Sequence, residues 1–181
     1  MLEEIVIAGF GGQGVLFTGQ LLAYAGMTEG RNVTWIPSYG PEMRGGTAHC
    51  TVIISDEEIG SPLVKQPSAA IVLNPPSMAK YAALVRPGGT LVVDSALITE
   101  RSGRSDIHEI DLPAKDIAAD LGLARAANVV ALGALIAATG VVQLETIVKI
   151  LTSRFAARPE VLLANKRALR MGAEYVIKIV A

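Results

Sequence analysis

The sequence predicts an α/β, Rossmann-like fold: an open, mostly parallel sheet with helices on both faces and a helical C-terminal third. Two observations lead to this fold class. Short apolar runs rich in Ile and Val alternate with helical segments over the first two thirds of the chain, a pattern typical of buried parallel strands joined by crossover helices. The 181 residues also suffice to bury one complete core, so we expect a single domain spanning residues 1–181.

Apolar segments bounded by turn residues are the expected strands. The first covers residues 3–10 and stops at a glycine turn. The others are 32–38, 47–54, 69–74, 89–95 and the weaker 107–112, with 59–64 as a short edge segment. In 47–54, the alternation places Ala48 and Cys50 on one face and Thr47 and His49 on the other, so this strand has one wetter side.

Helices are expected between and after these strands. They are placed at 13–29, from Pro75 onward, between Pro113 and Gly122, and at 129–142, 144–156 and 159–178. Asn128 is positioned to cap the helix at 129–142. Gly19, Ala23 and Gly26 form a stripe of small residues on the first helix, which indicates close backbone contact.

Composition and charge exclude several classes of function. The chain has 16 Lys and Arg against 17 Asp and Glu, without a basic stripe, so no nucleic-acid partner is expected. Cys50 is the only cysteine, which is too few thiolates for an iron–sulfur cluster or a structural zinc. Residues 126–144 carry no charge, but their Ala, Gly and Val content favours a buried helix over a membrane span. The acidic N-terminus lacks a signal-peptide pattern, so we expect a cytoplasmic protein with no membrane partner.

The cluster Gly-Phe-Gly-Gly-Gln-Gly at residues 9–14 follows the first strand and precedes the first helix. Its spacing is that of a dinucleotide fingerprint, in which backbone N–H groups and a helix N-terminus receive a phosphate. The same spacing also suits a tight turn that binds nothing. The second strand does not end on the acid that NAD requires, which disfavours a free-standing dehydrogenase.

A second cluster, Ser-Tyr-Gly-Pro-Glu-Met-Arg-Gly-Gly at 38–46, follows the second strand. Arg44 can grip an anion through its planar guanidinium, or Glu42 and Arg44 can brace the loop internally. Because the carboxyl ends of parallel strands meet at one edge, both clusters, Asn74 and Asp94 should converge there.

The remaining titratable side chains form no catalytic set. His49 and His108 are isolated, and Cys50 should point to the face opposite its neighbour His49. Neither a nucleophile elbow nor a P-loop lysine motif is present. Taken alone, the chain has the features of a binding or assembling domain.

The order of the motifs resembles the gamma subunit of 2-oxoacid:ferredoxin (acceptor) oxidoreductases. The motifs are GFGGQGV at 9–15, SYGPEMRGG at 38–46, SDEEIGSP at 55–62, PGGTLVVDS at 87–95 and NVVALGAL at 128–135. The resemblance covers nearly the whole chain. The second motif looks more like the 2-oxoglutarate or branched-chain 2-oxoacid branch than the pyruvate branch.

The resemblance implies a thiamine-diphosphate complex that oxidatively decarboxylates a 2-oxoacid, forms acyl-coenzyme A and passes electrons to ferredoxin. This chain would be a non-catalytic subunit, without a cofactor of its own. Thiamine diphosphate, Mg and iron–sulfur clusters are expected on alpha, beta and possibly delta partner subunits. The gamma chain is implicated in coenzyme A access. The residues expected to line that site are Gly11, Gly12, Gln13, Gly14, Ser38, Tyr39, Gly40, Glu42, Arg44 and Gly45.

Two other interpretations stay open. One is a stand-alone nucleotide-binding oxidoreductase that uses the loop at 9–14, and the other is a scaffold subunit whose glycine motifs only pack. The apolar helix at 129–142 and the small-residue stripe within 14–29 are also expected to lie between the chain's own sheet and a partner. We therefore expect the isolated chain to self-associate or dissolve poorly.

Overall fold

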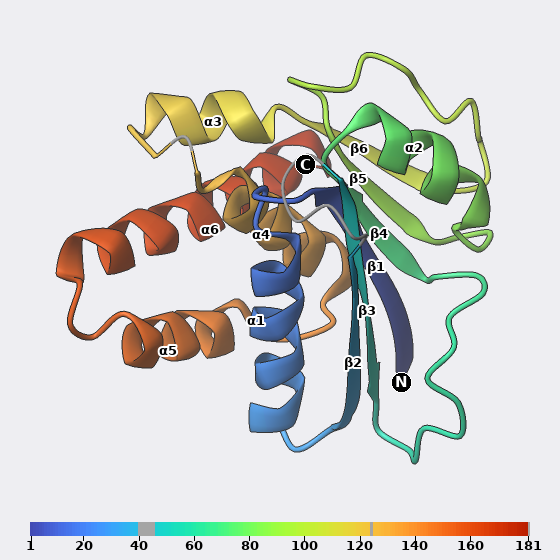
Figure 1. The fold of residues 1–181 in the computed structure, drawn as a ribbon, viewed down its shortest axis with the longest axis horizontal. Coiled ribbons are helices and arrows are strands. Elements are labelled where there is room, and N and C mark those ends of the chain that lie inside the picture. Colours follow the sequence, from blue (N-terminus) through green and yellow to red (C-terminus); the bar gives the residue numbers. More distant parts are fainter. Residues whose placement is uncertain (40–45, 124, 181) are drawn as a thin grey trace.

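The computed structural model describes residues 1–39, 46–123 and 125–180. Six strands form one sheet in the order β2-β3-β1-β4-β5-β6 (Figure 1). The strands are β1 (Leu2–Phe10), β2 (Asn32–Tyr39), β3 (Thr47–Ser55), β4 (Ala69–Val72), β5 (Thr90–Asp94) and β6 (His108–Leu112). The helices are α1 (Val15–Thr28), α2 (Pro75–Tyr81), α3 (Ala114–Asp120), α4 (Ala127–Thr139), α5 (Leu144–Arg154) and α6 (Pro159–Val180). The predicted α/β class is confirmed.

The sheet is mixed, with parallel pairing in its larger part. β1, β4, β5 and β6 are parallel neighbours, whereas β3 is antiparallel to both β1 and β2. The sequence pattern did not indicate this reversal. Residues 40–46 are too short to hold a crossover helix, so β3 runs back beside β2. As a result, the end of β1, the end of β2 and the start of β3 lie at the same edge of the sheet.

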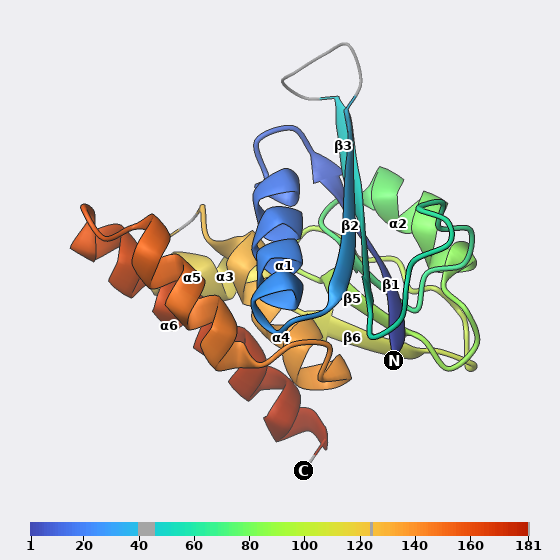
Figure 2. The ribbon, with the colours of Figure 1, turned by 90° about the horizontal axis from the view of Figure 1, so that it is seen from below.

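Helices cover both faces of the sheet unequally (Figures 1 and 2). On one face, α1 packs on β1, β2 and β3, α4 packs on β4 and β5, and α5 and α6 lie outside them. On the other face, α2 packs on β1 and β4. Alternate residues of each central strand supply the two cores: Ile5 and Ile7 of β1 join the first core, and Val6 joins the second.

The small residues of α1 and α4 pack within the chain itself. A Cβ on Gly19 would lie 2.8 Å from Trp35 Nε1, and one on Gly26 would lie 2.8 Å from Val33 Cγ2, so α1 sits close on β2. A Cβ on Gly133 of α4 would overlap the backbone of α6, and one on Gly172 of α6 would overlap the backbone of α4. For α4 the expectation that a partner covers the second face is wrong, because α6 of the same chain covers it. The small-residue stripe of α1 lies against the chain's own sheet, as expected.

Two local predictions also fail. Residues 59–64 form no strand; glycine, serine and proline at 60–62 interrupt the extended pattern, and Leu63 is 73% exposed. Asn128 does not cap α4. The helix begins at Ala127, one residue before Asn128, with Ala126 as its N-cap and no side-chain capping bond. Asn128 instead reaches across to α1, as described below.

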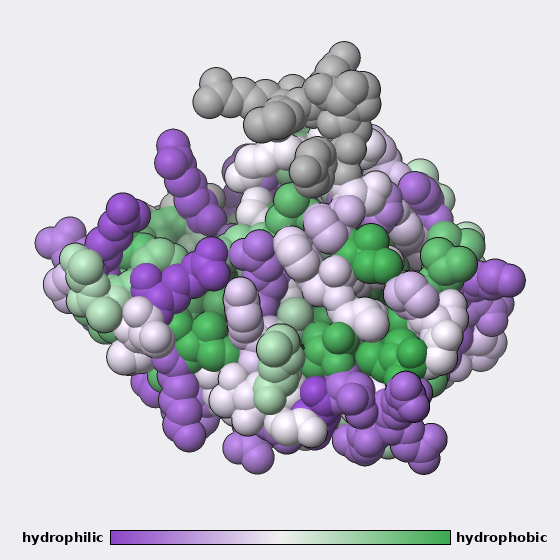
Figure 3. All heavy atoms as spheres, turned by 60° about the horizontal axis from the view of Figure 1, so that its bottom comes forward, coloured by the Kyte–Doolittle hydropathy of each residue, from purple (hydrophilic) through white to green (hydrophobic). Residues whose placement is uncertain are grey.

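Exposed apolar side chains are scattered over the surface. Figure 3 shows apolar areas separated by polar and charged side chains on one face of the molecule. Met27 and Tyr24 of α1 are 60% and 50% exposed, and Ile177 near the end of α6 is 62% exposed.

Among the described helices, none combines the length and apolar character that a membrane crossing requires.

Candidate functional site

The turn between β1 and α1 brings an uncapped helix N-terminus to the edge of the sheet. Gly12 and Gly14 adopt positive φ angles of 99° and 77°, which side chains other than glycine rarely adopt. Gly14 is the N-cap of α1, so no side chain caps the helix, and its first turn contains no acid. The first backbone N–H groups of α1 therefore keep a positive potential at this edge.

Gln13 holds the turn by bonding in two directions. Its Oε1 accepts a hydrogen bond from the Phe10 N–H at 2.6 Å, and its Nε2 donates to the Leu73 carbonyl at 2.9 Å. β1 and β4 are the neighbours between which the strand order reverses, the place where sheets of this kind bind ligands. The Gln13 amide thus joins the two strands at this crevice, and a Cβ on Gly9 would lie 2.6 Å from its Oε1.

Asn128, near the start of α4, holds the other side of the turn. Its Nδ2 donates to the Gly14 carbonyl at 3.2 Å and to Thr18 Oγ1 at 2.9 Å. The Thr18 hydroxyl donates to the same carbonyl at 3.0 Å. The sequence predicted Asn128 at the correct end of this helix but as its N-cap, whereas it is the second residue of α4 and its side chain bonds to α1.

The second glycine-rich cluster meets the first through the backbone. The Gly11 N–H donates to the Gly46 carbonyl at 3.0 Å, immediately before β3. Ser38 and Tyr39 are the last two residues of β2, and Ser38 is exposed. The remaining predicted contact residues, Gly40, Glu42, Arg44 and Gly45, lie outside the described residues.

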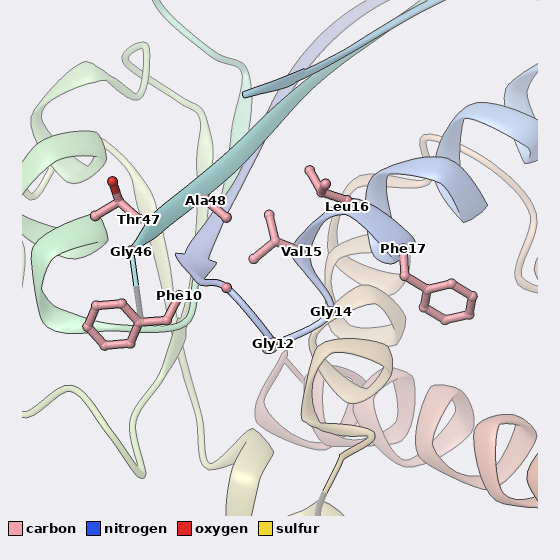
Figure 4. A pocket seen from close by; sticks show the side chains of 10 residues that line it. Phe10, Gly12, Gly14, Val15, Leu16, Phe17, Gly46, Thr47 and Ala48 are labelled. Atoms are coloured by element: carbon pink, nitrogen blue, oxygen red, sulfur yellow. The ribbon is translucent and has the colours of Figure 1, made fainter. Parts of the chain in front are cut away.

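The two clusters border a pocket of about 480 Å³. It is lined by Phe10, Gly11, Gly12, Gly14, Val15, Leu16, Phe17, Gly46, Thr47 and Ala48. Figure 4 shows the glycine turn crossing from β1 to α1, with Phe10 and Phe17 on opposite sides of it. None of these lining residues titrates. The pocket therefore offers backbone N–H groups and apolar walls, which suit binding rather than proton transfer.

The predicted convergence at one edge is confirmed. β1, β2, β4 and β5 run in the same direction, so their carboxyl ends, with the glycine turn, Ser38, Asn74 and Asp94, share this edge. Asn74 is buried and its Oδ1 accepts the Ser77 N–H at 2.8 Å, so it caps α2. Asp94, the last residue of β5, is buried, with 1% of its surface exposed.

The predicted separation of Cys50 and His49 is also confirmed. The Cys50 thiol faces α1, 3.6 Å from the Val15 carbonyl, and burial raises its pKa to about 12. His49 lies on the opposite face, with its ring centroid 5.7 Å from that of Tyr81. Burial, and next the Lys80 ammonium, lower the pKa of His49. In the part of the chain that the structure describes, His, Cys, Asp and Glu form no group of three that could hold a metal.

Fold and site together define a Rossmann-like binding domain with a glycine-lined pocket at the carboxyl edge of its sheet. The family model described as pyruvate ferredoxin/flavodoxin oxidoreductase matches residues 4–175, so the chain belongs to that family. Its fold is that of the family's gamma subunit. The keto/oxoacid ferredoxin oxidoreductase gamma subunit from Geobacter sulfurreducens superposes with a TM-score of 0.82 at 34% identity, over 97% of this chain and 99% of the other.

Two curated relatives show how this domain occurs in different chains. The ketoisovalerate oxidoreductase subunit VorA of Methanothermobacter thermautotrophicus is 42% identical over 95% of this chain, which spans 36% of that relative. The 2-oxoglutarate synthase subunit KorC of Methanothermobacter marburgensis is 39% identical over 78% of this chain and 80% of its own length. The present chain thus spans about a third of the first relative's length.

Proposed function

We propose that the chain is the gamma subunit of a thiamine-diphosphate-dependent 2-oxoacid:ferredoxin oxidoreductase. The complex would convert 2-oxoglutarate or a related 2-oxoacid to acyl-coenzyme A and pass the electrons to ferredoxin. Membership of the family and the similarity to KorC and VorA support this proposal. The observation that carries the subunit role is the similarity to the gamma subunit from Geobacter sulfurreducens over nearly the whole of both chains. The glycine-lined pocket supports a ligand role for this chain.

The reactive groups of the complex belong to partner subunits in this proposal. Thiamine diphosphate with Mg would supply the decarboxylation chemistry, and iron–sulfur clusters would carry the electrons, on alpha, beta and, where present, delta chains. Cys50 cannot serve a cluster, because its thiol is buried between β3 and α1. This chain contributes assembly and one wall of the coenzyme A site.

The glycine turn is suited to a phosphorylated ligand such as coenzyme A. The N–H groups at the start of α1 can donate to phosphate oxygens, and the helix dipole favours the negative charge. Gly12, where a side chain would extend into open space, lets the backbone approach the ligand, whereas Gly14 makes room for Asn128. Gln13 has both ends of its amide bonded within the chain, so its role is to position the turn.

The second cluster would complete the site. Arg44, with its planar donor fork, would hold a phosphate, and Ser38, Tyr39, Gly40, Glu42 and Gly45 would shape the loop around it. This role can be separated from catalysis, because a binding contact changes the Michaelis constant for coenzyme A and leaves turnover unchanged.

The test is steady-state kinetics of the reconstituted complex carrying Arg44→Ala. Loss of one charge-assisted contact should raise the KM for coenzyme A about tenfold, with kcat within about twofold. Arg158→Ala, at an exposed arginine before α6, is the matched control and should leave both constants unchanged. An unchanged KM in an assembled Arg44→Ala complex would remove the coenzyme A role of the loop. Failure of the chain to assemble with thiamine-diphosphate partners would remove the subunit role.

A further inference from the structure

The two edges of the sheet differ in how they are protected. β6 forms one edge and β2 forms the other (Figure 1). On the β6 edge, Glu109 and Asp111 carry carboxylates, and the Tyr175 hydroxyl of α6 donates to the Asp111 carbonyl at 2.8 Å. Charged side chains and covering contacts of this kind hinder an edge strand from pairing with another chain. β2 has eight residues and no charged side chain, so its edge lacks this protection.

The hydrogen bonds between β1 and β3 reveal which backbone groups of β2 point outward. At the two ends of this pairing, the Gly11 N–H donates to the Gly46 carbonyl, and the Asp56 N–H donates to that of Met1. The register between them is continuous, so even-numbered residues of β3 direct their backbone groups to β1 and odd-numbered residues direct theirs to β2. Odd-numbered residues of β3 oppose even-numbered residues of β2. The residues of β2 whose backbone groups point to the open side are therefore Val33, Trp35 and Pro37.

Pro37 confirms this direction, because a proline in a sheet usually turns its nitrogen to the open side of an edge strand. The outward donors are then the N–H groups of Val33 and Trp35. Among the described residues outside β3, none bonds to the backbone of β2. These two donors and the outward carbonyls can therefore receive an added strand.

The side chains on both sides of this edge are uncharged. On the α1 side, a groove of about 200 Å³ runs beside the strand. It is lined by Gln20, Ala23, Tyr24, Met27, Val33 and Trp35. On the opposite side, α2 packs on β1 and β4, and Ile36 of β2 is 40% exposed. An added strand would thus find apolar contacts on each face as well as backbone partners.

A second copy of the chain matches this edge. Antiparallel pairing about a two-fold axis can place Trp35 opposite Trp35 of the second copy and Val33 opposite its Pro37. Each Trp35 N–H then donates to the opposite Trp35 carbonyl, and each Val33 N–H donates to the opposite Pro37 carbonyl. Both outward donors are satisfied, and like charges do not meet, because neither β2 nor α1 contains a charged residue.

We propose that two copies of the chain associate through β2, paired antiparallel and centred on Trp35, so that their sheets become continuous. In this register, Thr34 of each copy faces Ile36 of the other on the side opposite α1. The two α1 helices lie on the same face of the joined sheet, because the two-fold axis is perpendicular to it. This inference does not rest on the proposed function, since it requires neither a ligand nor a partner subunit.

The first test is analytical ultracentrifugation of the purified full chain over a wide range of concentrations, where we expect a reversible dimer. Ile36→Lys should raise the dissociation constant of the dimer at least about tenfold, because a lysine on an edge strand opposes pairing. Ile177→Lys, at an exposed apolar position of α6, is the matched control and should dimerise as wild type does. A chain that stays monomeric, or a folded Ile36→Lys variant that dimerises as wild type does, would overturn the proposal.

The second test traps the register. Residues that oppose each other in a non-hydrogen-bonded antiparallel pair have Cα atoms about 4.5 Å apart, within the range of a disulfide. The double variant Thr34→Cys/Ile36→Cys should therefore form a covalent dimer on mild oxidation. Ile36→Cys alone is the matched control and should not, because each position 36 faces position 34 of the other copy. Cys50 is buried and does not compete. A dimer that the double variant fails to trap would overturn the pairing through β2.

Amide hydrogen exchange distinguishes a second copy from another occupant of the edge. The amides of Val33 and Trp35 should exchange at least about tenfold more slowly in the dimer than in dilute solution. Those of Thr34 and Ile36 face β3 and should be protected in both. If Val33 and Trp35 become protected only when partner subunits are added, the edge belongs to a contact with another subunit, and the proposal is overturned.

Discussion

The side chain of Asn128 donates from Nδ2 to the carbonyl of Gly14 at 3.2 Å, which joins two helix N-termini that are 114 residues apart in sequence. The same amide donates to Thr18 Oγ1, so one buried side chain of α4 fixes two groups at the start of α1. The geometry of the glycine turn therefore depends on α4 as well as on its own residues.

Asn128→Ala should destabilise the chain by about 1–3 kcal/mol, because it removes a buried donor and leaves the Gly14 carbonyl and Thr18 hydroxyl with fewer partners. Urea unfolding followed by circular dichroism measures the change in the free energy of unfolding. Asn165→Ala is the control, since Asn165 bonds only to Val161 within its own helix at an exposed position. Equal losses of unfolding free energy in Asn128→Ala and Asn165→Ala would show that the Asn128 hydrogen bonds do not stabilise the glycine turn.

Gly133→Ala and Gly172→Ala should each destabilise the chain by roughly 3 kcal/mol or more, because the added methyl meets the backbone of the facing helix. Gly60→Ala has open space and an ordinary φ, so it should change the free energy of unfolding by less than about 0.5 kcal/mol. Thermal unfolding of the three variants checks this. Tolerance of both helix substitutions would mean that α4 and α6 do not pack as described.

Cys50 should be almost unreactive in the folded chain. Its pKa rises from 9.0 to about 12 on burial, so the thiolate fraction at pH 8 falls about a thousandfold. Labelling with a disulfide reagent should be slow in buffer and fast in urea. Rapid labelling of the folded chain would show that α1 does not stay packed on β3.

Asp94→Asn should stabilise the chain at pH 7. Burial raises the pKa of Asp94 above its unfolded value, so the ionised form costs free energy at neutral pH. That cost declines as the pH falls through the folded pKa and disappears below the unfolded pKa. The advantage of the variant should therefore shrink between pH 7 and acidic pH, as measured by urea unfolding at several pH values. A stabilisation by Asp94→Asn that grows toward acidic pH would contradict a raised pKa of Asp94.

The sequence predicted most of the secondary structure and the location of the site. Apolar runs bounded by glycine and proline mark β1, β4 and β5, and parallel strands bring their carboxyl ends together. The insertion of β3 between β2 and β1 could not be predicted, because it depends on pairing between strands far apart in sequence.

The sequence also did not predict how the small residues pack or which hydrogen bonds support the site. Gly133 and Gly172 signal close approach, but periodicity alone does not tell whether the facing helix belongs to the same chain or to another. Gln13 and Asn128 both bond to residues at least 60 positions away, so their roles required the folded structure.

We propose that this chain is part of a decarboxylating complex whose reactive centre lies on partner subunits. The direct measurement is anaerobic, coenzyme A-dependent reduction of ferredoxin with a 2-oxoacid, assayed with the chain alone, with its partner subunits alone and with both together. We predict turnover only when all are combined, with a KM for coenzyme A that depends on this chain. Turnover by the isolated chain would show that the reactive centre lies on this chain and would contradict the proposal.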